Sequence, residues 1–427
     1  MTFYQKKRKL SRIFYSKSTN LFVLEMFTDL CYHMKYNENA GDGIVFMQLE
    51  KFKAGGYAKQ NDYSTFVPAP VDIPWEWRDT SLNMLLERAS GEIGGLNAFA
   101  ELVPNIDVYI TMHIRTEANK SSKIEGTKTS IEEDLMRIED IAPEKLDDYI
   151  EVHNYINALQ HGINRITVDD FPLCLRLIRE IHEVLMQGVR GEHKAPGEFR
   201  KSQNWIGGTM PSRAMYVPPS VPDMNIALSD FEKFLNNDAY NVPHLVKAAI
   251  AHYQFETIHP FLDGNGRVGR LIVPLYLLNK GVITKPCFYI SDYFERNREL
   301  YYAALDKPRR ENDLAHWVKF FLTAAIDTAK SAKVKFSNAV NVVNRLNETA
   351  SAVKGNIENV RAILNAFYIE PVLNMKEICE KTSLQQRTAS NIASDMQKRG
   401  ILLETTRFSR NKTFMLKEYV DVFKIDQ

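Results

Sequence analysis

The sequence has few cysteines, no long apolar run and almost no net charge, and each absence excludes a class of protein. Its four cysteines lie far apart, at positions 31, 174, 287 and 379, and form no C-x-x-C pair, which argues against a disulfide framework and a cysteine zinc site. No stretch approaches the roughly 20 consecutive apolar residues of a membrane-spanning helix. A formal charge of +1 over 427 residues gives no general attraction to nucleic acid or to anionic lipid.

The N-terminal residues lack a targeting feature, because the basic run at residues 6–9 is not followed by a clean apolar core. We therefore expect no secretory signal and a cytoplasmic location. Residues 1–46 show no sustained periodicity, and two interpretations stay open for them: an upstream extension of the reading frame, or a small added subdomain.

The remaining composition is typical of a soluble globular protein, with 44% hydrophobic and 25% charged residues. At ~100–200 residues per domain, the length predicts two to three domains. Prolines mark an extended segment over residues 66–77, and helical spacing of apolar residues begins at about residue 82, so we expect a mainly α fold. The further predicted helices cover residues 105–125, 150–163, 171–186, 221–236, 243–258, 268–279, 293–305 and 313–347. Gly126 is a candidate C-terminal stop for the 105–125 helix, and Ser130 with Glu133 forms a candidate capping box for a following helix.

Two regions depart from this helical pattern. Residues 197–219 hold short extended runs around a polar tip, which predicts a β-hairpin. Residues 356–427 hold, in order, a helix, a short helix, a turn, a longer helix and two short strands, which is the order of a winged helix-turn-helix domain. The predicted helices there cover residues 360–367, 375–381 and 385–398, and the strands cover 401–404 and 413–416.

Residues 259–270, HPFLDGNGRVGR, form the most informative pattern in the chain. The glycine-rich turn precedes a predicted helix, so its backbone N–H groups can face an anion at a helix N-terminus. Arg267 and Arg270 share one side of that helix, and two fixed cations fit a polyphosphate better than a single carboxylate. Asp263 is placed to hold Mg²⁺ near such phosphates. His259 is the only group here that can take a proton near pH 7.

Each of these features alone has an ordinary structural explanation. A lone histidine is usually a core or surface residue, and two arginines on a helix usually face solvent. The G-x-G-x-x-G match at residues 264–269 is weak evidence for a dinucleotide site, because a helix precedes it where such a site needs a strand. The joint occurrence of base, carboxylate, glycines and arginines within twelve residues is what favours a nucleotide site.

This segment resembles the signature of Fic-domain proteins, H-x-F-x-D-G-N-G-R-x-x-R, at every specified position, and the likeness covers roughly residues 65–325. The resemblance implies a mostly helical core with a β-hairpin flap that uses Mg²⁺ and transfers AMP from ATP to a protein hydroxyl, releasing pyrophosphate. It implies that His259 deprotonates a target Ser, Thr or Tyr hydroxyl, that Phe261 anchors the loop and that Asp263 holds the metal. The ATP-binding residues that it implies are Gly264, Asn265, Gly266, Arg267, Val268, Gly269, Arg270 and Tyr302. The flap residues that would register a target segment by strand addition are Gly207, Gly208 and Thr209.

A second motif, SSKIEG at residues 121–126, resembles the inhibitory motif of the same family, [S/T]-x-x-x-E-[G/N]. The resemblance implies an inhibitory helix at about residues 105–126. Its Glu125, with Ser121 and Gly126, would pair with Arg270 and occupy the place of the ATP γ-phosphate. We therefore expect the enzyme to be self-inhibited.

These observations predict three parts: an N-terminal extension at residues 1–64, a Fic domain at 65–350 and a winged-helix domain at 351–427. Three functions stay open: a self-inhibited adenylyltransferase, a DNA-binding regulator whose Fic core senses nucleotide, and a Fic enzyme that removes AMP or transfers another nucleotide. Residues 356–427 hold 11 basic and 9 acidic residues, which is a mild charge for a DNA binder. The expected partners are ATP and a hydroxyl-bearing target protein, with a homodimer as a further expectation, and no membrane.

Overall fold

The computed structural model describes residues 46–188, 193–405 and 412–424. As predicted, the fold is mainly α. The helices are α3 (Thr80–Leu102), α4 (Ile106–Glu125), α5 (Ile131–Asp134), α6 (Leu146–Thr167), α7 (Leu175–Leu185), α8 (Val221–Asn236), α9 (His244–Ile258), α10 (Asn265–Asn279), α11 (Ser291–Arg296), α12 (Arg298–Glu311), α13 (Leu314–Thr349), α14 (Ile357–Ile369), α15 (Met375–Thr382), α16 (Gln386–Lys398) and α17 (Lys417–Lys424). The strands are β1 (Met47–Gln48), β2 (Gly55–Lys59), β3 (Ser64–Pro68), β4 (Trp75–Glu76), β5 (Val372–Asn374), β6 (Leu403–Glu404) and β7 (Thr413–Met415). The two interpretations of residues 1–46 concern residues that, except for residue 46, lie outside the described part of the chain.

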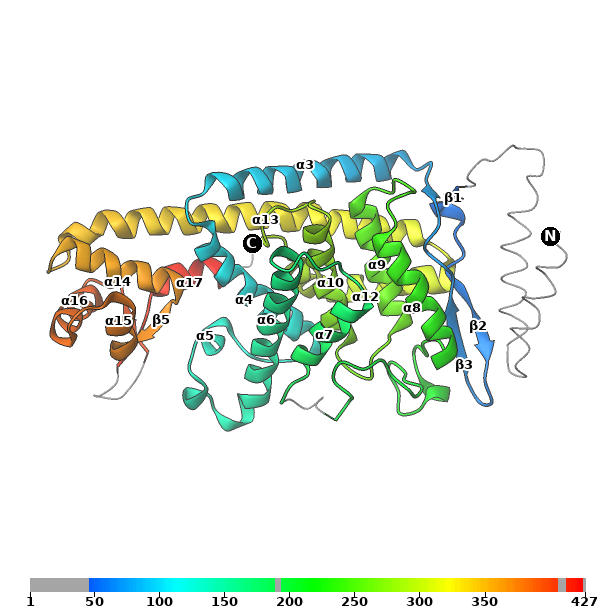
Figure 1. Ribbon diagram of the computed structural model, residues 1–427, viewed down its shortest axis with the longest axis horizontal. Coiled ribbons are helices and arrows are strands. Elements are labelled where there is room, and N and C mark those ends of the chain that lie inside the picture. Colours follow the sequence, from blue (N-terminus) through cyan, green and yellow to red (C-terminus); the bar gives the residue numbers. More distant parts are fainter. Residues whose placement is uncertain (1–45, 189–192, 406–411, 425–427) are drawn as a thin grey trace.

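The long helix α13 organises the molecule. It has 36 residues, which corresponds to about 54 Å. It lies alongside α3 and connects the helical body to the winged-helix end (Figure 1). At the centre of the body, α9 packs against α10, and every residue of α9 from Leu245 to Ile258 is buried. The loop between these two helices is the 259–264 part of the signature, so it is held by the most buried elements of the fold.

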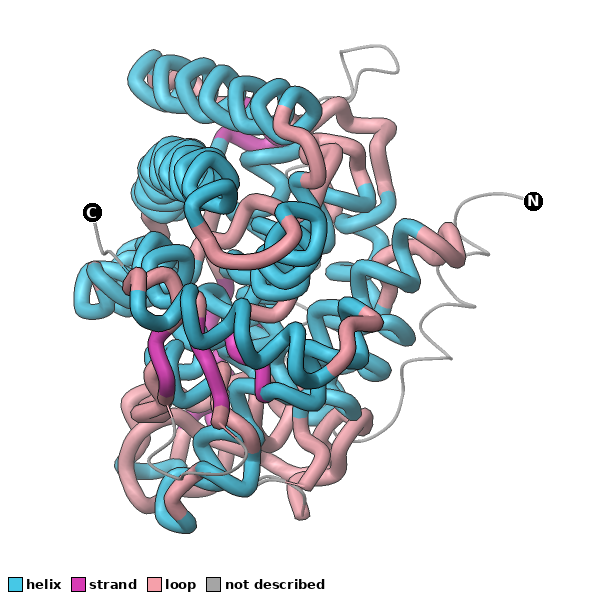
Figure 2. The backbone as a smooth tube through the Cα atoms, turned by 90° about the vertical axis from the view of Figure 1, so that its left-hand side faces the viewer, coloured by secondary structure: helices cyan, strands magenta, loops and turns pink. Residues whose placement is uncertain are grey.

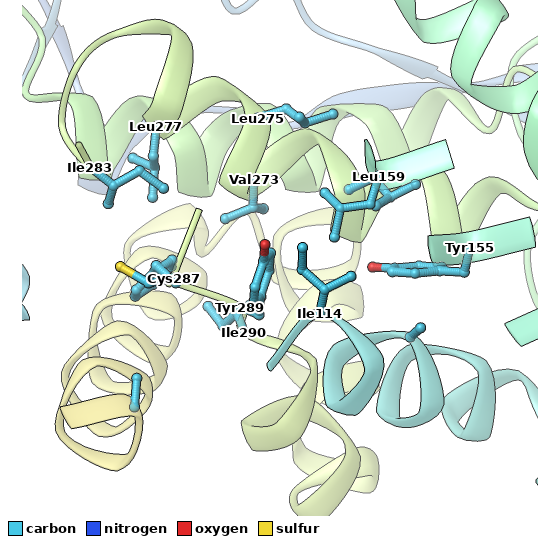
Figure 3. Close-up of a cluster of buried hydrophobic side chains, with 14 of the residues drawn as sticks. Ile114, Tyr155, Leu159, Val273, Leu275, Leu277, Ile283, Cys287, Tyr289 and Ile290 are labelled. Carbon is cyan, nitrogen blue, oxygen red and sulfur yellow. The ribbon is translucent and has the colours of Figure 1, made fainter. Parts of the chain in front are cut away.

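Helix α4 is fixed against this core. Side chains from α4, α6, α10 and the segment after α10 pack together (Figure 3), including Ile114, Tyr155, Leu159, Val273, Leu275, Leu277, Ile283, Cys287, Tyr289 and Ile290. Within the core, the carboxylate of Glu117 on α4 accepts hydrogen bonds from the Tyr155 hydroxyl of α6 at 2.8 Å and from Ser291 of α11. Burial raises the pKa of Glu117 to about 7, although these hydrogen bonds and Arg270 oppose the shift. The position of α4 relative to α10 is therefore set by both apolar packing and buried hydrogen bonds.

One helical prediction is confirmed and one needed correction. The capping box forms, because Ser130 accepts from the Glu133 amide and the Glu133 carboxylate accepts from the Ser130 amide, but the helix α5 that it opens has only four residues. The helix predicted over residues 293–305 is two helices, α11 and α12, separated at Asn297, whose φ of −116° and ψ of 37° are not helical.

The hairpin predicted at residues 197–219 is present only as one antiparallel bridge between Ile206 and Tyr216, with a 3-10 turn at Pro211–Arg213. The prolines and glycines of this segment remove ladder donors and packing side chains, which prevents longer strands. A regular hairpin forms instead from β2 and β3, which pair antiparallel from Gly55 with Pro68 to Lys59 with Ser64. This hairpin crosses the domain boundary predicted at residue 64.

The C-terminal region has the predicted order of a winged helix-turn-helix. Its three strands pair antiparallel in the order β5-β7-β6, and the strands lie beside the helices at the end of the molecule that faces the viewer in Figure 2. Ser383, at φ 57°, makes the turn between α15 and α16. Helices α14 and α17 contact α4, and the Tyr419 hydroxyl of α17 donates to the Val108 carbonyl of α4 at 3.4 Å. The C-terminal region therefore packs directly on α4, the helix that ends at Glu125.

None of the described helices combines the length and apolar character that crossing a membrane requires.

Candidate active site

The signature loop is shaped by two residues in the left-handed conformation. His259 ends α9 at φ 49°, and Gly264 precedes α10 at φ 75°. Asn265 holds the loop closed, because its side-chain oxygen accepts from the Phe261 amide and its side-chain nitrogen donates to the Phe261 carbonyl, both at 2.8 Å. The Phe261 ring is fully buried and stacks on His182 with ring centroids 3.7 Å apart. The loop therefore has one fixed shape.

A cavity of about 340 Å³ opens beside this loop. It brings together the predicted base, the predicted metal ligand and the glycine-rich turn. Its lining consists of Glu125, Gly126, Thr127, Glu151, His259, Leu262, Asp263, Gly264, Asn265, Gly266 and Arg267. Arg270 is not among the described residues that line the cavity; it contacts the lining residue Glu125 at 2.7 Å.

Not every predicted nucleotide-binding residue faces this cavity. The Val268 amide donates to the Gly264 carbonyl at 3.0 Å, and the Gly264 amide donates to the Asp263 side chain at 2.6 Å. The amides left to face an anion are therefore those of Asn265, Gly266 and Arg267, at the start of α10. Tyr302 is 44% exposed and is not among the described residues that line the cavity.

His259 is held by a network that the sequence did not reveal. Its carbonyl accepts from Arg200 Nε at 3.1 Å and from Asn204 Nδ2 at 3.2 Å, and Arg200 is almost fully buried. Burial lowers the pKa of His259 to about 4, although the Glu256 carbonyl opposes the shift. The imidazole is therefore neutral at pH 7, which is the form that accepts a proton.

The predicted inhibitory pair is formed. Arg270 Nη2 donates to Glu125 Oε1 at 2.7 Å, Arg270 Nε donates to the Ser121 hydroxyl at 2.8 Å, and Nη2 also donates to the Ser121 carbonyl at 3.0 Å. Gly126 ends α4 at φ 108°. Burial alone would raise the pKa of Glu125, but Arg270 outweighs this and holds that pKa below its usual value. Both partners are therefore charged at neutral pH.

The glycines of the signature leave room for two carboxylates. A Cβ at position 266 would collide with Glu125 Oε1, and a Cβ at position 269 would collide with Glu256 Oε1. Glu256 is buried, its Oε1 has no hydrogen-bond partner among the described residues, and burial raises its pKa to about 7. Gly266 and Gly269 are thus required by close packing against acidic side chains.

Arg267 has longer contacts than Arg270. Its Nη1 lies 3.5 Å from Glu151 Oε2 on α6, and its Nη2 lies 3.9 Å from Asp263 Oδ1. Sequence reasoning missed both Glu151 and Glu256, because each is a single carboxylate on a helix and only tertiary packing brings it to the site.

The sequence of this chain is similar to those of known proteins. The Fic/DOC family N-terminal model matches residues 83–164, and the Fic/DOC family model matches residues 172–277. Protein adenylyltransferase Fic of Drosophila grimshawi is 33% identical over 176 residues, covering 41% of this chain and 33% of that protein. The Aedes aegypti protein of the same name is 35% identical over 177 residues, covering 40% and 32%. The chain thus spans about a third of the length of these curated relatives. The crystal structure of a Fic family protein from Desulfovibrio desulfuricans G20 aligns over 80% of this chain and 97% of that chain, with 21% identity and a TM-score of 0.49.

Proposed function

Because residues 83–164 and 172–277 are Fic/DOC-family domains, we propose that this chain is a self-inhibited protein adenylyltransferase. It transfers AMP from ATP to a Ser, Thr or Tyr hydroxyl of a target protein or of itself. The observation that supports this most directly is the shared cavity, which places a neutral imidazole beside three helix N-terminal amides and an arginine. The names of the curated relatives support the same reaction.

In the proposed reaction, the hydroxyl oxygen attacks the α-phosphorus of ATP and the bond to the bridging oxygen of the β-phosphate breaks. The hydroxyl proton passes to the imidazole of His259, and pyrophosphate leaves. The amides of residues 265–267 and the guanidinium of Arg267 stabilise the negative charge on the phosphates. Such reactions depend mainly on positioning and charge neutralisation, and the rigid loop between α9 and α10 provides both.

Asp263 fits the role of a Mg²⁺ ligand. Its side chain is 49% exposed and lines the cavity, and one of its oxygens is engaged by the Gly264 amide. The described residues contain no cluster of three or more metal-ligating side chains. A single carboxylate suits Mg²⁺, which keeps most of its waters and takes phosphate oxygens as further ligands. When bound, the metal would neutralise phosphate charge.

Self-inhibition follows from the contact between Glu125 and Arg270. The carboxylate occupies the arginine that we assign to the γ-phosphate, so ATP and Glu125 compete for one cation. Labelled ATP and gel detection test this assignment. We expect Glu125→Gly to raise self-labelling and His259→Ala to abolish it in either background. Equal labelling of wild type and His259→Ala would refute the assigned base. GTP, CTP and UTP in the same assay define the nucleotide.

The segment at residues 204–216 is the proposed target-docking flap. It is tied to the signature loop by Asn204 Nδ2 donating to the Phe261 carbonyl at 2.8 Å, and to the end of α9 by the Tyr216 hydroxyl donating to the Thr257 carbonyl at 2.6 Å. Gly207 and Gly208, at φ 70° and 72°, form its turn. Its exposed side chains include four large apolar ones, Trp205, Ile206, Met210 and Met215, together with the charged Arg213. We therefore propose that target segments carry apolar side chains next to the modified hydroxyl.

A second candidate function, DNA binding, is favoured by the outer face of α16. Its exposed residues include Gln386, Arg387, Asn391 and Lys398, which suit base edges and phosphates, and none of its exposed residues is acidic. The other face packs on α14 and α15. Duplex DNA binding by the full chain, measured by fluorescence anisotropy, should weaken with salt and with Arg387→Ala. DNA binding that is unaffected by both salt and Arg387→Ala would exclude this function.

A further inference from the structure

The two arginines of the signature, Arg267 and Arg270, differ in how closely their N–H groups are hydrogen-bonded. Arg270 makes three hydrogen bonds of 2.7 to 3.0 Å with Glu125 and Ser121. Among the described residues, the polar contacts of Arg267 are all 3.5 Å or longer, to Glu151, the Met186 sulfur and Asp263. The Arg267 side chain is only 6% exposed, and its Nε is buried without a hydrogen-bond partner among the described residues. A buried guanidinium with long contacts is ready to accept a closer anion.

Glu151 is the carboxylate nearest to this arginine. It lies on α6, its side chain is 13% exposed, and it lines the cavity together with Asp263. Its helix is fixed by neighbours in the core, since Val152 is fully buried and the Tyr155 hydroxyl binds Glu117. Glu151 therefore stays at the cavity on an element separate from α4, which carries the inhibitory glutamate.

The charges around the cavity oppose an entering polyphosphate. Glu125, Glu151 and Asp263 carry three negative charges against the two positive charges of Arg267 and Arg270. Burial keeps the imidazole neutral at pH 7. Removing any one of these carboxylates therefore shifts the site toward anion binding.

We propose that Glu151 is a second acidic competitor for the phosphate groups, which sets nucleotide affinity through Arg267 as Glu125 does through Arg270. This inference rests on the proposed function of the site. The two carboxylates have separable effects. Glu125 occupies the place of the γ-phosphate and discriminates ATP from ADP. Glu151 acts on phosphates that ATP and ADP share, so it lowers the affinity for both nucleotides by a similar factor. Glu151 is a positioning residue, because it acts through the arginine.

Isothermal titration calorimetry of the full chain with ADP and with ATP, each with and without Mg²⁺, tests this. Glu151→Gln should tighten both nucleotides by a similar factor, about three- to ten-fold, as for the loss of one partly buried ion pair. Glu125→Gly should tighten ATP more than ADP. Because the two carboxylates contact different arginines, the double variant should show the product of the two factors.

Controls separate charge from structure. Glu151→Asp keeps the charge and should stay closer to wild type than Glu151→Gln, while Glu151→Ser, a second neutral variant, should reproduce the gain. Glu139→Gln removes an exposed carboxylate from the 3-10 turn at Ile138–Asp140 and should change nothing. The advantage of Gln over Glu at position 151 should shrink as salt rises, which structural damage would not produce.

The titrations distinguish failure of the role assigned to Glu151 from failure of the proposed function of the site. Unchanged or weaker nucleotide binding in both neutral variants, with normal binding by wild type and Glu125→Gly, would overturn the role of Glu151 and leave the proposed function intact. Failure of every variant to bind ATP and ADP would overturn both.

Discussion

Replacing Glu125 tests the coupling between inhibition and stability. The carboxylate is 35% exposed and Arg270 is 1% exposed, so the pair is only partly shielded from water. Breaking a fully buried pair costs about 3–5 kcal/mol, and a charge-assisted hydrogen bond contributes about 1.5–3 kcal/mol. Discounting for exposure, we take about 2 kcal/mol for this contact.

ATP must displace this contact before its γ-phosphate can reach Arg270. A contact of about 2 kcal/mol therefore lowers productive ATP binding by about 30-fold. We expect Glu125→Gly, and the isosteric Glu125→Gln, to raise the initial rate of AMP transfer by about that factor at ATP concentrations below saturation. Initial rates of labelling from α-labelled ATP measure this directly.

The same change leaves Arg270 with Ser121 as its hydrogen-bond partner among the described residues. The variants should therefore be less stable than wild type without nucleotide. ATP should then raise their melting temperature more than it raises that of wild type, because tighter ligands stabilise more. Ser121→Ala, which removes one acceptor but keeps the carboxylate, should activate less than Glu125→Gln. Rates within twofold of wild type in both Glu125 variants would refute the competition between carboxylate and γ-phosphate.

Three further predictions follow from the geometry. Because the pKa of free His259 is about 4, kcat/KM of Glu125→Gly should stay flat from pH 8 to about pH 5 and fall only below that, whereas an ordinary histidine would cause a fall near pH 6.5. In the same background, peptides with leucine beside the acceptor threonine should be labelled faster than peptides with lysine there. Met215, which is 88% exposed, belongs to the flap, so Met215→Ser should reduce this difference in labelling rate. Leu102 is 82% exposed but lies outside the flap, so Leu102→Ser should leave the difference unchanged. Gly269→Ala should lower the free energy of unfolding by about 1–3 kcal/mol in urea titrations, because its Cβ would collide with Glu256.

Sequence reasoning was most accurate for elements that are determined by residues close together in the chain. The helix at α8 has the predicted bounds because Ser220 caps it and Pro222 suits its first turn. The stop at Gly126 needs only a positive φ, which glycine adopts readily. The signature loop was predictable because its base, carboxylate, amides and arginines lie within twelve consecutive residues.

The features that sequence reasoning missed depend on contacts between distant segments. The attachment of the flap depends on such contacts, because Asn204 hydrogen-bonds to the signature loop and Tyr216 to the end of α9, 57 and 41 residues further along the chain. Arg200 supports the His259 carbonyl across a similar separation. Glu151 occupies a helical position that sequence alone cannot distinguish from a solvated one, and only the packing of α6 beside α10 brings it to the cavity.

Helix α4 has a consequence for how signals could pass through the molecule. Its C-terminal residue, Glu125, binds Arg270 at the proposed nucleotide site, while Val108, in its first turn, accepts a hydrogen bond from Tyr419 of α17. Because one helix contacts both sites, binding at either site changes the binding equilibrium at the other, and the coupling free energy is the same in both directions. A partner that binds more tightly when the C-terminal region is released from α4 would favour ATP binding. ATP binding would equally favour binding of that partner.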